Sequence, residues 1–535
     1  MSYQVSINPK TGDTELVVSG WQNGLADSPY TGIARMQNLC PWYYPGAVYP
    51  NYTRINGTSG SPTIAQPLYI TTSDPNGYTG EALRFVIDAS GNMVGQTSGG
   101  GSFVAITPGN APLTTAVTGL CFFAPTQQGN GIVSNKSYIF AWGNGGANMY
   151  YLAAPFTGGG ANNWTNFGSY TQQGAGTNYA IWSSFSNGMY FCNGNFVGSM
   201  LKGSSDFNPG GSASTDYVFQ NGAVVLPYYE TAVWLGELGT NLLIAAGNRI
   251  YLWPFTGANP TSFIQFPEPV YKFIVINNLI YAFCGDKGNI YVSNSYSISL
   301  FKKVPDSFFT VGNTTSGYVQ TDPQISWGGI MYHRNMLYFG ASSNTQTAAL
   351  GYISGVFSLN LSTAVLNFEN QSSYGLYGTI PTGGNGQPIF LMDNQASQTD
   401  SYFSAYFNNS VGGIDKSSTT FYSSGETIIE TDLIPIGRFL NPTTPLNVEF
   451  KLDAPMSAND SIQILGRGSL SSPYISFGTY TFVSNDTNNS FAFTSTPLQN
   501  LQWLQLQVIV TASSGNPFRL YELRIRSNEP LQITI

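Results

Sequence analysis

The chain has 535 residues, a formal net charge of −8 and only 9% charged residues, against ~25% in an average soluble domain. It contains no basic run, which argues against sequence-specific binding of nucleic acid. The length predicts two or three domains, because a single core rarely grows beyond ~250–300 residues. With 60 glycines, 34 tyrosines and 34 phenylalanines, the composition predicts an all-β fold.

Residues 1–65 lack the hairpin spacing seen further along the chain, so we expect an extended N-terminal arm that leads into the first folded domain. The arm carries bulky apolar side chains that no local sheet would bury, namely Trp21, Leu39, Trp42, Tyr43 and Tyr44. A large exposed apolar patch would aggregate. We therefore predict that these side chains contact either a neighbouring protein or the chain's own next domain. The first residues have neither the basic nor the apolar region of a secretory signal.

Residues 66–423 repeat one hairpin pattern: an apolar aromatic strand, a Gly/Asn turn, and an apolar strand that carries tyrosine. Asn-Gly, the dipeptide that suits tight hairpin turns, recurs along this region. The copies are anchored at Val94, Tyr151, Phe196, Tyr251, Tyr291, Tyr352 and Tyr402. Their spacing approximates the ~40–50 residues of a propeller blade plus loops. We predict a β-propeller of about seven blades, with six or eight as alternatives and stacked sandwiches as the competing architecture.

Residues 424–535 have a different pattern of strict alternation. Val448, Phe450 and Leu452 alternate with polar residues, and Leu523 and Ile525 do the same near the end of the chain. Alternation with a period of two is typical of half-buried strands. Six to eight such strands predict a C-terminal β-sandwich, jelly-roll-like in organisation.

The search for chemistry yields no catalytic residue, metal site or cofactor site. The single histidine, His333, precedes a predicted strand and has no G-x-S-x-G motif to accompany it, so we interpret it as a turn residue. Glu230 and Glu237 lie among aromatics and could serve a glycosidase, which needs only two carboxylates. The four cysteines form no CxxC pair. We interpret them as reduced, buried, small hydrophobic residues.

Two segments resemble a known family. Residues 21–52 include Asn-Gly-Leu-Ala-Asp-Ser-Pro-Tyr and Pro-Gly-Ala-Val, and residues 520–526 read Leu-Tyr-Glu-Leu-Arg-Ile-Arg. Both resemble segments of tailed-bacteriophage virion proteins, in which a propeller precedes a sandwich. The resemblance implies a non-enzymatic tail component of the nozzle or adaptor kind, located in the virion. Its partners would be copies of itself and other virion proteins in a symmetric, oligomeric assembly.

Two other functions stay open at this point. The first is a carbohydrate-binding adhesin or receptor-binding protein for host attachment, because Tyr, Trp, Asn and Gln suit contacts with a cell-surface glycan. The second is a glycan-cleaving propeller enzyme. Membrane insertion is not expected, because the most apolar stretch, residues 271–283, is too short to span a bilayer.

Overall fold

The computed structural model is built from β-strands, 43 in the part of the chain that it describes, with no helix among them. Its longer described runs are residues 117–129, 164–173, 185–305, 325–333, 335–343, 354–371, 411–421, 427–436, 456–469, 472–482, 498–512 and 519–527. The other described residues are mostly the shorter strands whose bounds follow. Among all of these, no helix is long and apolar enough to cross a membrane.

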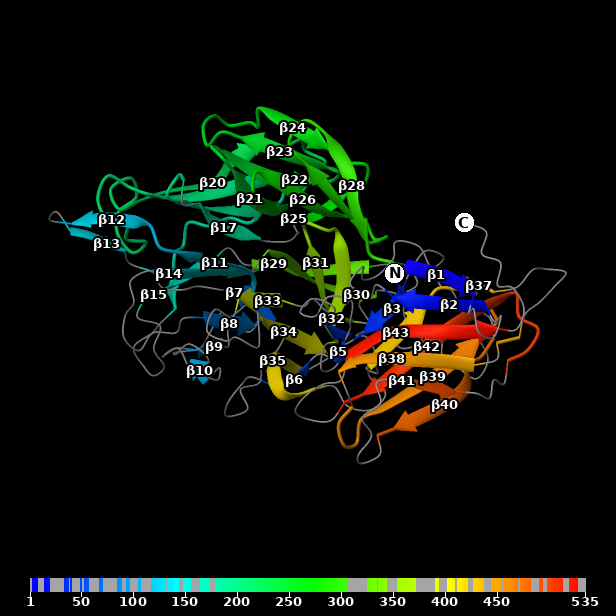
Figure 1. Ribbon diagram of the computed structural model, residues 1–535. Helices are drawn as coiled ribbons and strands as arrows, with labels where there is room; N and C mark the ends of the chain where they lie inside the picture. Colours follow the sequence, from blue (N-terminus) through cyan, green and yellow to red (C-terminus); the bar gives the residue numbers. More distant parts are fainter. Residues whose placement is uncertain are drawn as a thin grey trace.

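Seven four-stranded antiparallel units, here called blades A to G, form the larger domain (Figure 1). Blades A to C are β7 (Pro67–Ile70), β8 (Arg84–Asp88), β9 (Met93–Gln96), β10 (Val104–Ile106); β11 (Val117–Phe123), β14 (Tyr138–Gly143), β15 (Met149–Ala153), β16 (Thr165–Asn166); and β17 (Ala180–Ser183), β18 (Gly188–Asn193), β19 (Phe196–Lys202), β20 (Tyr217–Val225). Blades D and E are β21 (Ala232–Leu238), β22 (Asn241–Ala246), β23 (Arg249–Trp253), β24 (Ser262–Gln265); and β25 (Val270–Ile276), β26 (Leu279–Cys284), β27 (Asn289–Ser293), β28 (Ile298–Lys303). Blades F and G are β29 (Ile325–His333), β30 (Met336–Ser343), β31 (Ser354–Asn360), β32 (Val365–Gln371); and β33 (Phe390–Asp393), β34 (Tyr402–Asn408), β35 (Val411–Phe421), β6 (Tyr52–Asn56). A hairpin of β12 (Thr126–Gly129) and β13 (Ile132–Asn135) projects from blade B.

The blades close into a ring. The first strands of successive blades contact one another in turn from β7 to β33, and β33 contacts β7 again. Blade G takes three strands from the end of the region and its fourth, β6, from near the N-terminus. Strand β6 is thus the outermost strand of blade G, and the last blade combines strands from the start and the end of the propeller region. The chain therefore contains a seven-bladed β-propeller, as the repeat spacing predicts.

The predicted hairpin repeat corresponds to the central strands of the blades. Tyr151, Phe196, Tyr251 and Tyr291 all lie on third strands, and Tyr402 begins a second strand. The turns have the expected chemistry, because both central residues of the β25–β26 hairpin are asparagines with positive φ, as a type I′ turn requires. Tyr352 lies outside the described residues.

The apolar core lies between adjacent blades. One cluster, which includes Trp142 and Phe191, joins blades B and C, and a second, which includes Tyr190 and Trp253, joins C and D. A third, with Ile250 and Phe273, joins D and E. Aromatic residues fill these interfaces because each radial sheet must bury both of its faces, and large rings cover the widening gap between two blades.

The second domain is a sandwich of two sheets. The first has the order β1 (Ser2–Ile7), β2 (Thr14–Ser19), β43 (Arg519–Ser527), β38 (Asn447–Ala454), β41 (Ser490–Phe493). The second has the order β3 (Ile33–Gln37), β36 (Thr427–Thr431), β42 (Trp503–Thr511), β39 (Ser461–Arg467), β40 (Ile475–Thr481), with β37 (Ile434–Pro435) pairing with β42. Val448, Phe450, Leu523 and Ile525 are fully buried, so the predicted alternation points the expected residues inward.

A continuous sheet joins the two domains. The last strand of blade F, β32, pairs with β3 in a short parallel ladder, and β3 pairs in turn with β36 of the sandwich. A single apolar cluster extends across the junction, from Phe283 and Phe339 in blades E and F to Val508 and Ile525 in the sandwich. The propeller and sandwich therefore form one packed body, in contrast to two domains on a linker.

The expectation of an extended arm over residues 1–65 is wrong. Figure 1 shows the blue strands β1, β2 and β3 lying among the orange and red strands of the sandwich. Strand β6 completes blade G, so the propeller begins before the predicted residue 66. The sandwich likewise extends beyond residues 424–535, since it includes strands from both ends of the chain. The pairings were missed because they join residues far apart in sequence, for example Thr14 and Ser527.

The cysteines whose side chains are described agree with the interpretation as small hydrophobic residues. Cys121, Cys192 and Cys284 are buried and free, and each lies on a blade strand. Burial raises the pKa of each of these thiols above its ordinary value, because the thiolate would lose its hydration. They contribute to packing in the interblade cores.

Candidate functional site

One face of the propeller is organised by a repeated set of backbone hydrogen bonds. We call it the turn face; it is formed by the turns between the second and third strands and by the connections between successive blades. In three consecutive blades, the first strand begins with an N–H that donates to the preceding blade's turn: Ala232 to Gly194 O at 2.9 Å, Val270 to Gly247 O at 2.8 Å and Ile325 to Asp286 O at 2.8 Å. These bonds fix the blade-to-blade distance on this face.

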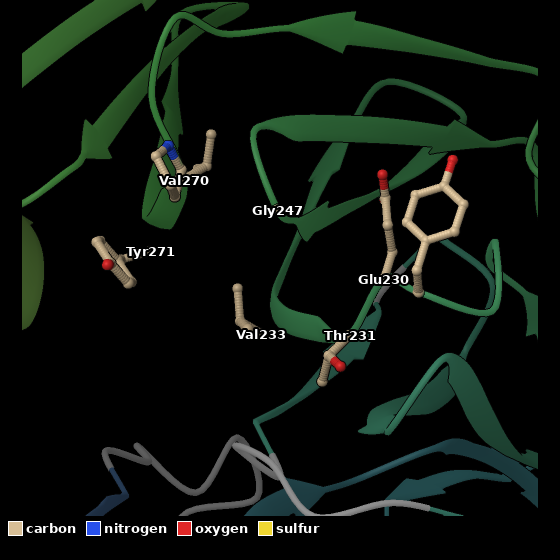
Figure 2. Close-up of a pocket in the computed structure, with 8 residues that line it drawn as sticks. Glu230, Thr231, Val233, Gly247, Val270 and Tyr271 are labelled. Atoms are coloured by element: carbon tan, nitrogen blue, oxygen red, sulfur yellow. The ribbon is translucent and has the colours of Figure 1, made fainter.

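A pocket opens on the turn face between blades D and E. It has a volume of about 280 Å³ and is lined by Tyr229, Glu230, Thr231, Val233, Gly247, Pro269, Val270 and Tyr271. Figure 2 shows Tyr271 and Val270 on the blade E side and Glu230, Thr231 and Val233 on the blade D side. We call this the D–E pocket. It combines aliphatic walls, tyrosine rings and one carboxylate.

Arg249 neutralises the carboxylate of Glu230. Arg249 begins β23, and its Nη1 donates to Glu230 Oε1 at 2.8 Å, while its Nε donates to Gln265 Oε1 at 2.9 Å. Its guanidinium carbon also lies 4.9 Å from the centre of the Phe263 ring. The pKa of Arg249 is raised above its ordinary value, mainly by a hydrogen bond to the Tyr251 hydroxyl and next by one to the Tyr229 hydroxyl. The guanidinium is therefore a permanent cation here.

The second carboxylate oxygen of Glu230, Oε2, accepts no hydrogen bond from Arg249. Glu230 is only 7% exposed, and its Oε2 is buried without a hydrogen-bond partner among the described residues. Blade E repeats the arrangement, because Glu268 also lies two residues before its first strand and accepts a hydrogen bond from Asn289 Nδ2 at 2.8 Å. Asn289 begins β27, as Arg249 begins β23. The two glutamates thus occupy equivalent positions, and each ties its own third strand to the turn face.

The two carboxylates suggested for glycan cleavage do not meet. Glu230 precedes β21 on the turn face, whereas Glu237 lies near the far end of that strand. Glu237 lies five residue steps after Ala232 along the strand, which corresponds to roughly 16 Å at ~3.3 Å per residue. Glycosidase carboxyls lie within ~5–9.5 Å of each other. This pair therefore lacks the spacing of a glycosidase site.

The other predicted positions are placed as follows. His333 ends β29 and pairs with Met336 across a tight hairpin, which agrees with its interpretation as a turn residue. Of the proposed arm residues, Leu39 is fully buried in this chain's own core, and its carbonyl accepts a hydrogen bond from Asn367 Nδ2 at 2.9 Å. Trp21, Trp42, Tyr43 and Tyr44 lie outside the described residues. Within the described part of the chain, no three His, Cys, Asp or Glu side chains gather as metal ligands would.

The inner wall of the ring carries a second polar feature, which the sequence did not reveal. Tyr179, Trp234 and Lys272 occupy equivalent positions at the start of the first strands of blades C, D and E. The Tyr179 and Trp234 rings stack 3.6 Å apart, and Lys272 Nζ lies 5.0 Å from the centre of the Trp234 ring. Lys272 Nζ also donates to Gly328 O at 2.6 Å. Burial lowers the pKa of Lys272 to about 8.

Comparison with known proteins finds similarity to solved structures alone. No protein-family description matches the chain, and no curated protein matches it. Among solved structures, β-propeller proteins are similar to it: YCF48 bound to a D1 peptide, with 9% identity, a TM-score of 0.40 and coverage of 69% of this chain and 96% of that one. BamB from Moraxella catarrhalis has 8% identity, a TM-score of 0.34 and coverage of 67% and 97%. Sqt1 from Saccharomyces cerevisiae has 10% identity, a TM-score of 0.35 and coverage of 76% and 93%.

The class of protein follows from strand order and ring closure. The chain is a seven-bladed β-propeller fused to a β-sandwich, and the sandwich incorporates the first strands of the chain. Among the residues that the structure describes, the D–E pocket on the turn face is a candidate site.

Proposed function

We propose that the chain is a non-enzymatic structural protein of a tailed-phage virion, a nozzle- or adaptor-like tail component that holds contacts with copies of itself and with other virion proteins. The observation that supports this best is the junction between the domains. A sheet that runs from blade F into the sandwich, with one core across it, makes the chain a rigid block. A rigid block keeps fixed distances between the surfaces that neighbouring subunits bind, as a symmetric assembly requires.

Two further observations agree with a contact-making role. The two segments that resemble virion proteins each supply a strand to the sandwich, β3 from the first segment and β43 from the second. The carboxylates that could have supported glycan cleavage lie at opposite ends of one strand, and Glu230 is engaged by Arg249. The packed two-domain body and its surface are thus suited to binding other proteins.

The experiment that tests this role is a stoichiometric analysis of purified particles. Mass spectrometry with isotope-labelled peptides of the chain should find several copies per particle, and an electron-microscopic reconstruction should place them in a ring of the tail. The purified chain should show no glycan hydrolysis. A chain absent from particles, or one whose hydrolytic activity disappears in the Glu230→Gln variant, would contradict the proposal.

A further inference from the structure

One long stretch of the chain is almost free of charge. Residues 89–201 contain a single charged residue, Lys136, whereas the chain's own frequency of 9% predicts about ten in a stretch of this length. The stretch supplies the second half of blade A, all of blade B and the first three strands of blade C. Its exposed side chains are hydroxyls, amides and an aromatic ring, and they include Thr165, Asn166, Ser169, Thr171, Gln173 and Phe185. We call the surface that residues 117–201 form on blades B and C the neutral flank.

The lack of charge on the neutral flank constrains what can bind it. Surfaces of small soluble domains normally carry ~25–35% Lys, Arg, Glu and Asp, and depletion of charge is typical of the core of a protein–protein interface. A charged partner surface would lose its hydration against this flank and find no opposite charge to compensate the loss. The partner surface must therefore be uncharged as well. Because the whole chain has a net charge of −8, two copies repel each other least where both present the neutral flank.

Blade B also differs from other blades in its first hairpin. In blades D, E and F a two-residue turn joins the first two strands, between the paired residues Leu238 and Asn241, Ile276 and Leu279, and His333 and Met336. In blade B the paired residues are Phe123 and Tyr138, and the chain between them forms the extra hairpin of β12 and β13. The hairpin has a fixed base, because Phe123, Ala124, Ser137 and Tyr138 are buried. Closing the blade does not require this extension.

The extra hairpin lacks support from the rest of the described chain. Strands β12 and β13 pair only with each other among the described strands, and Figure 1 shows them extending outward beyond β11 and β14. A two-stranded hairpin without further packing is marginally stable in water. Its outer edges carry backbone N–H and C=O groups that can pair with another strand, and proteins usually protect such edges with lysine or proline. Neither residue type occurs in β12 or β13. The hairpin therefore has the features of a strand-pairing contact.

The two edges of the hairpin are not equally suited to pairing. Strand β13 contains Ile132 and Val133, and β-branched residues favour strands. Strand β12 follows Pro125 and ends at Gly129, two residue types that weaken a ladder. An antiparallel pair of two identical strands is related by a two-fold axis, which is the commonest symmetry of homo-oligomers. Pairing of β13 with its own copy would thus give a four-stranded sheet that spans two chains.

We propose that β13 of one chain pairs antiparallel with β13 of a second copy, and that the neutral flank is the surface through which the two copies meet. This inference rests on the proposed function in one respect, since it specifies how the chain contacts copies of itself. The two can fail separately. A chain that dimerises through β13 but is absent from particles would refute the virion role alone. A chain that is present in particles but does not dimerise through β13 would refute this contact alone.

The test is a charge exchange at Ser134, which lies on β13. Sedimentation equilibrium of the full-length chain should show dimers that form with increasing concentration. Ser134→Lys alone and Ser134→Glu alone should each raise the dissociation constant of the dimer at least about 10-fold, because the two-fold axis brings two like charges close together. An equimolar mixture of the two variants should dimerise about as well as the unmodified chain, since each lysine then meets a glutamate.

The matched control is Thr240→Lys. Thr240 is exposed in the tight turn that joins the first two strands of blade D, so the variant makes the same change of charge at the corresponding place of another blade. It should dimerise as the unmodified chain does. The proposal is overturned if the unmodified chain stays monomeric up to about 100 μM. It is also overturned if the mixture associates as weakly as the separate Ser134 variants, or if Thr240→Lys weakens the dimer as much as they do.

Discussion

The clearest physical consequence of the fold is that a cavity made in blade F should loosen the sandwich. Phe339 on β30 is fully buried in the cluster that crosses the junction. Its ring lies 5.1 Å from Phe283, 5.8 Å from Trp327 and 5.4 Å from Phe357, measured between ring centres. Phe339→Ala removes all three contacts, and truncation of a buried phenylalanine costs about 3–5 kcal/mol. At ~1.4 kcal/mol for each factor of ten, the opening equilibrium of this region should shift by about two to three and a half orders of magnitude.

Hydrogen–deuterium exchange measured by mass spectrometry can locate this loss. Peptides that cover β36, β39 and β42 of the sandwich should exchange faster in Phe339→Ala, because these strands share both a sheet and a core with blade F. The matched control is Phe191→Ala, which truncates an equally buried ring in the cluster between blades B and C. The control should accelerate exchange in blades B and C and affect the sandwich less. Unchanged sandwich exchange in Phe339→Ala would refute the idea of a single packed body.

Three further predictions concern local features. Burial lowers the pKa of Lys272 to about 8, whereas the unfolded lysine keeps its value of 10.5, so the unfolded chain binds more protons between these two pH values. The free energy of unfolding, measured by urea titration relative to Lys272→Met, should therefore rise from pH 8 to pH 10. A difference that stays constant over this range would contradict the burial of the amine. Gly285→Ala should destabilise the chain more than Gly239→Ala by about 1–3 kcal/mol. Both glycines have a φ of +58°, but only at Gly285 would an added Cβ collide with Glu268. Equal midpoints of thermal unfolding for the two variants would show that backbone strain alone decides the effect. Asn193→Ala should lower the free energy of unfolding, measured by denaturant titration, by roughly 3 kcal/mol, because three hydrogen bonds of a fully buried side chain are lost. A decrease of less than ~0.5 kcal/mol would mean that water replaces these hydrogen bonds.

The sequence predicts the local part of this fold well. The hairpins, their tyrosine-bearing strands and the approximate number of blades all follow from turn residues and strand periodicity, which act over a few neighbouring residues. Tyr251 and Tyr291 are on the third strands of blades D and E because the repeated pattern is itself a local hairpin. What the sequence could not predict is pairing at long range. Strand β6 joins β35 through Asn56 and Asp415, and no local spacing encodes that pairing.

The candidate site was predicted in part. The aromatic residues around Glu230 mark it in the sequence, but its pairing with Glu237, as a glycosidase would require, does not form, because seven residues of largely extended chain separate the two carboxylates. The true partner, Arg249, is 19 residues further along and meets Glu230 only when the blade has formed. A usable signal was present in the sequence, since Glu268 repeats the position of Glu230 relative to the next first strand. Lys272 could not be assigned to the inner wall before the blades were arranged in a ring.

The interleaving of the two domains constrains how the protein can form. The propeller needs β6 to complete blade G, and the sandwich needs β1, β2 and β3 to complete both of its sheets. Strand β2 pairs with β43, so the first sandwich sheet cannot close until the whole propeller region between these strands has been synthesised. Such non-local pairing slows folding, because the entropy of a very long loop is lost before the contacts form. Once formed, the pairing of β2 with β43 places both strands inside one sheet, so detachment of either strand must break that sheet. A block of this kind resists partial opening, which is the mechanical property that a contact-holding part of an assembly requires.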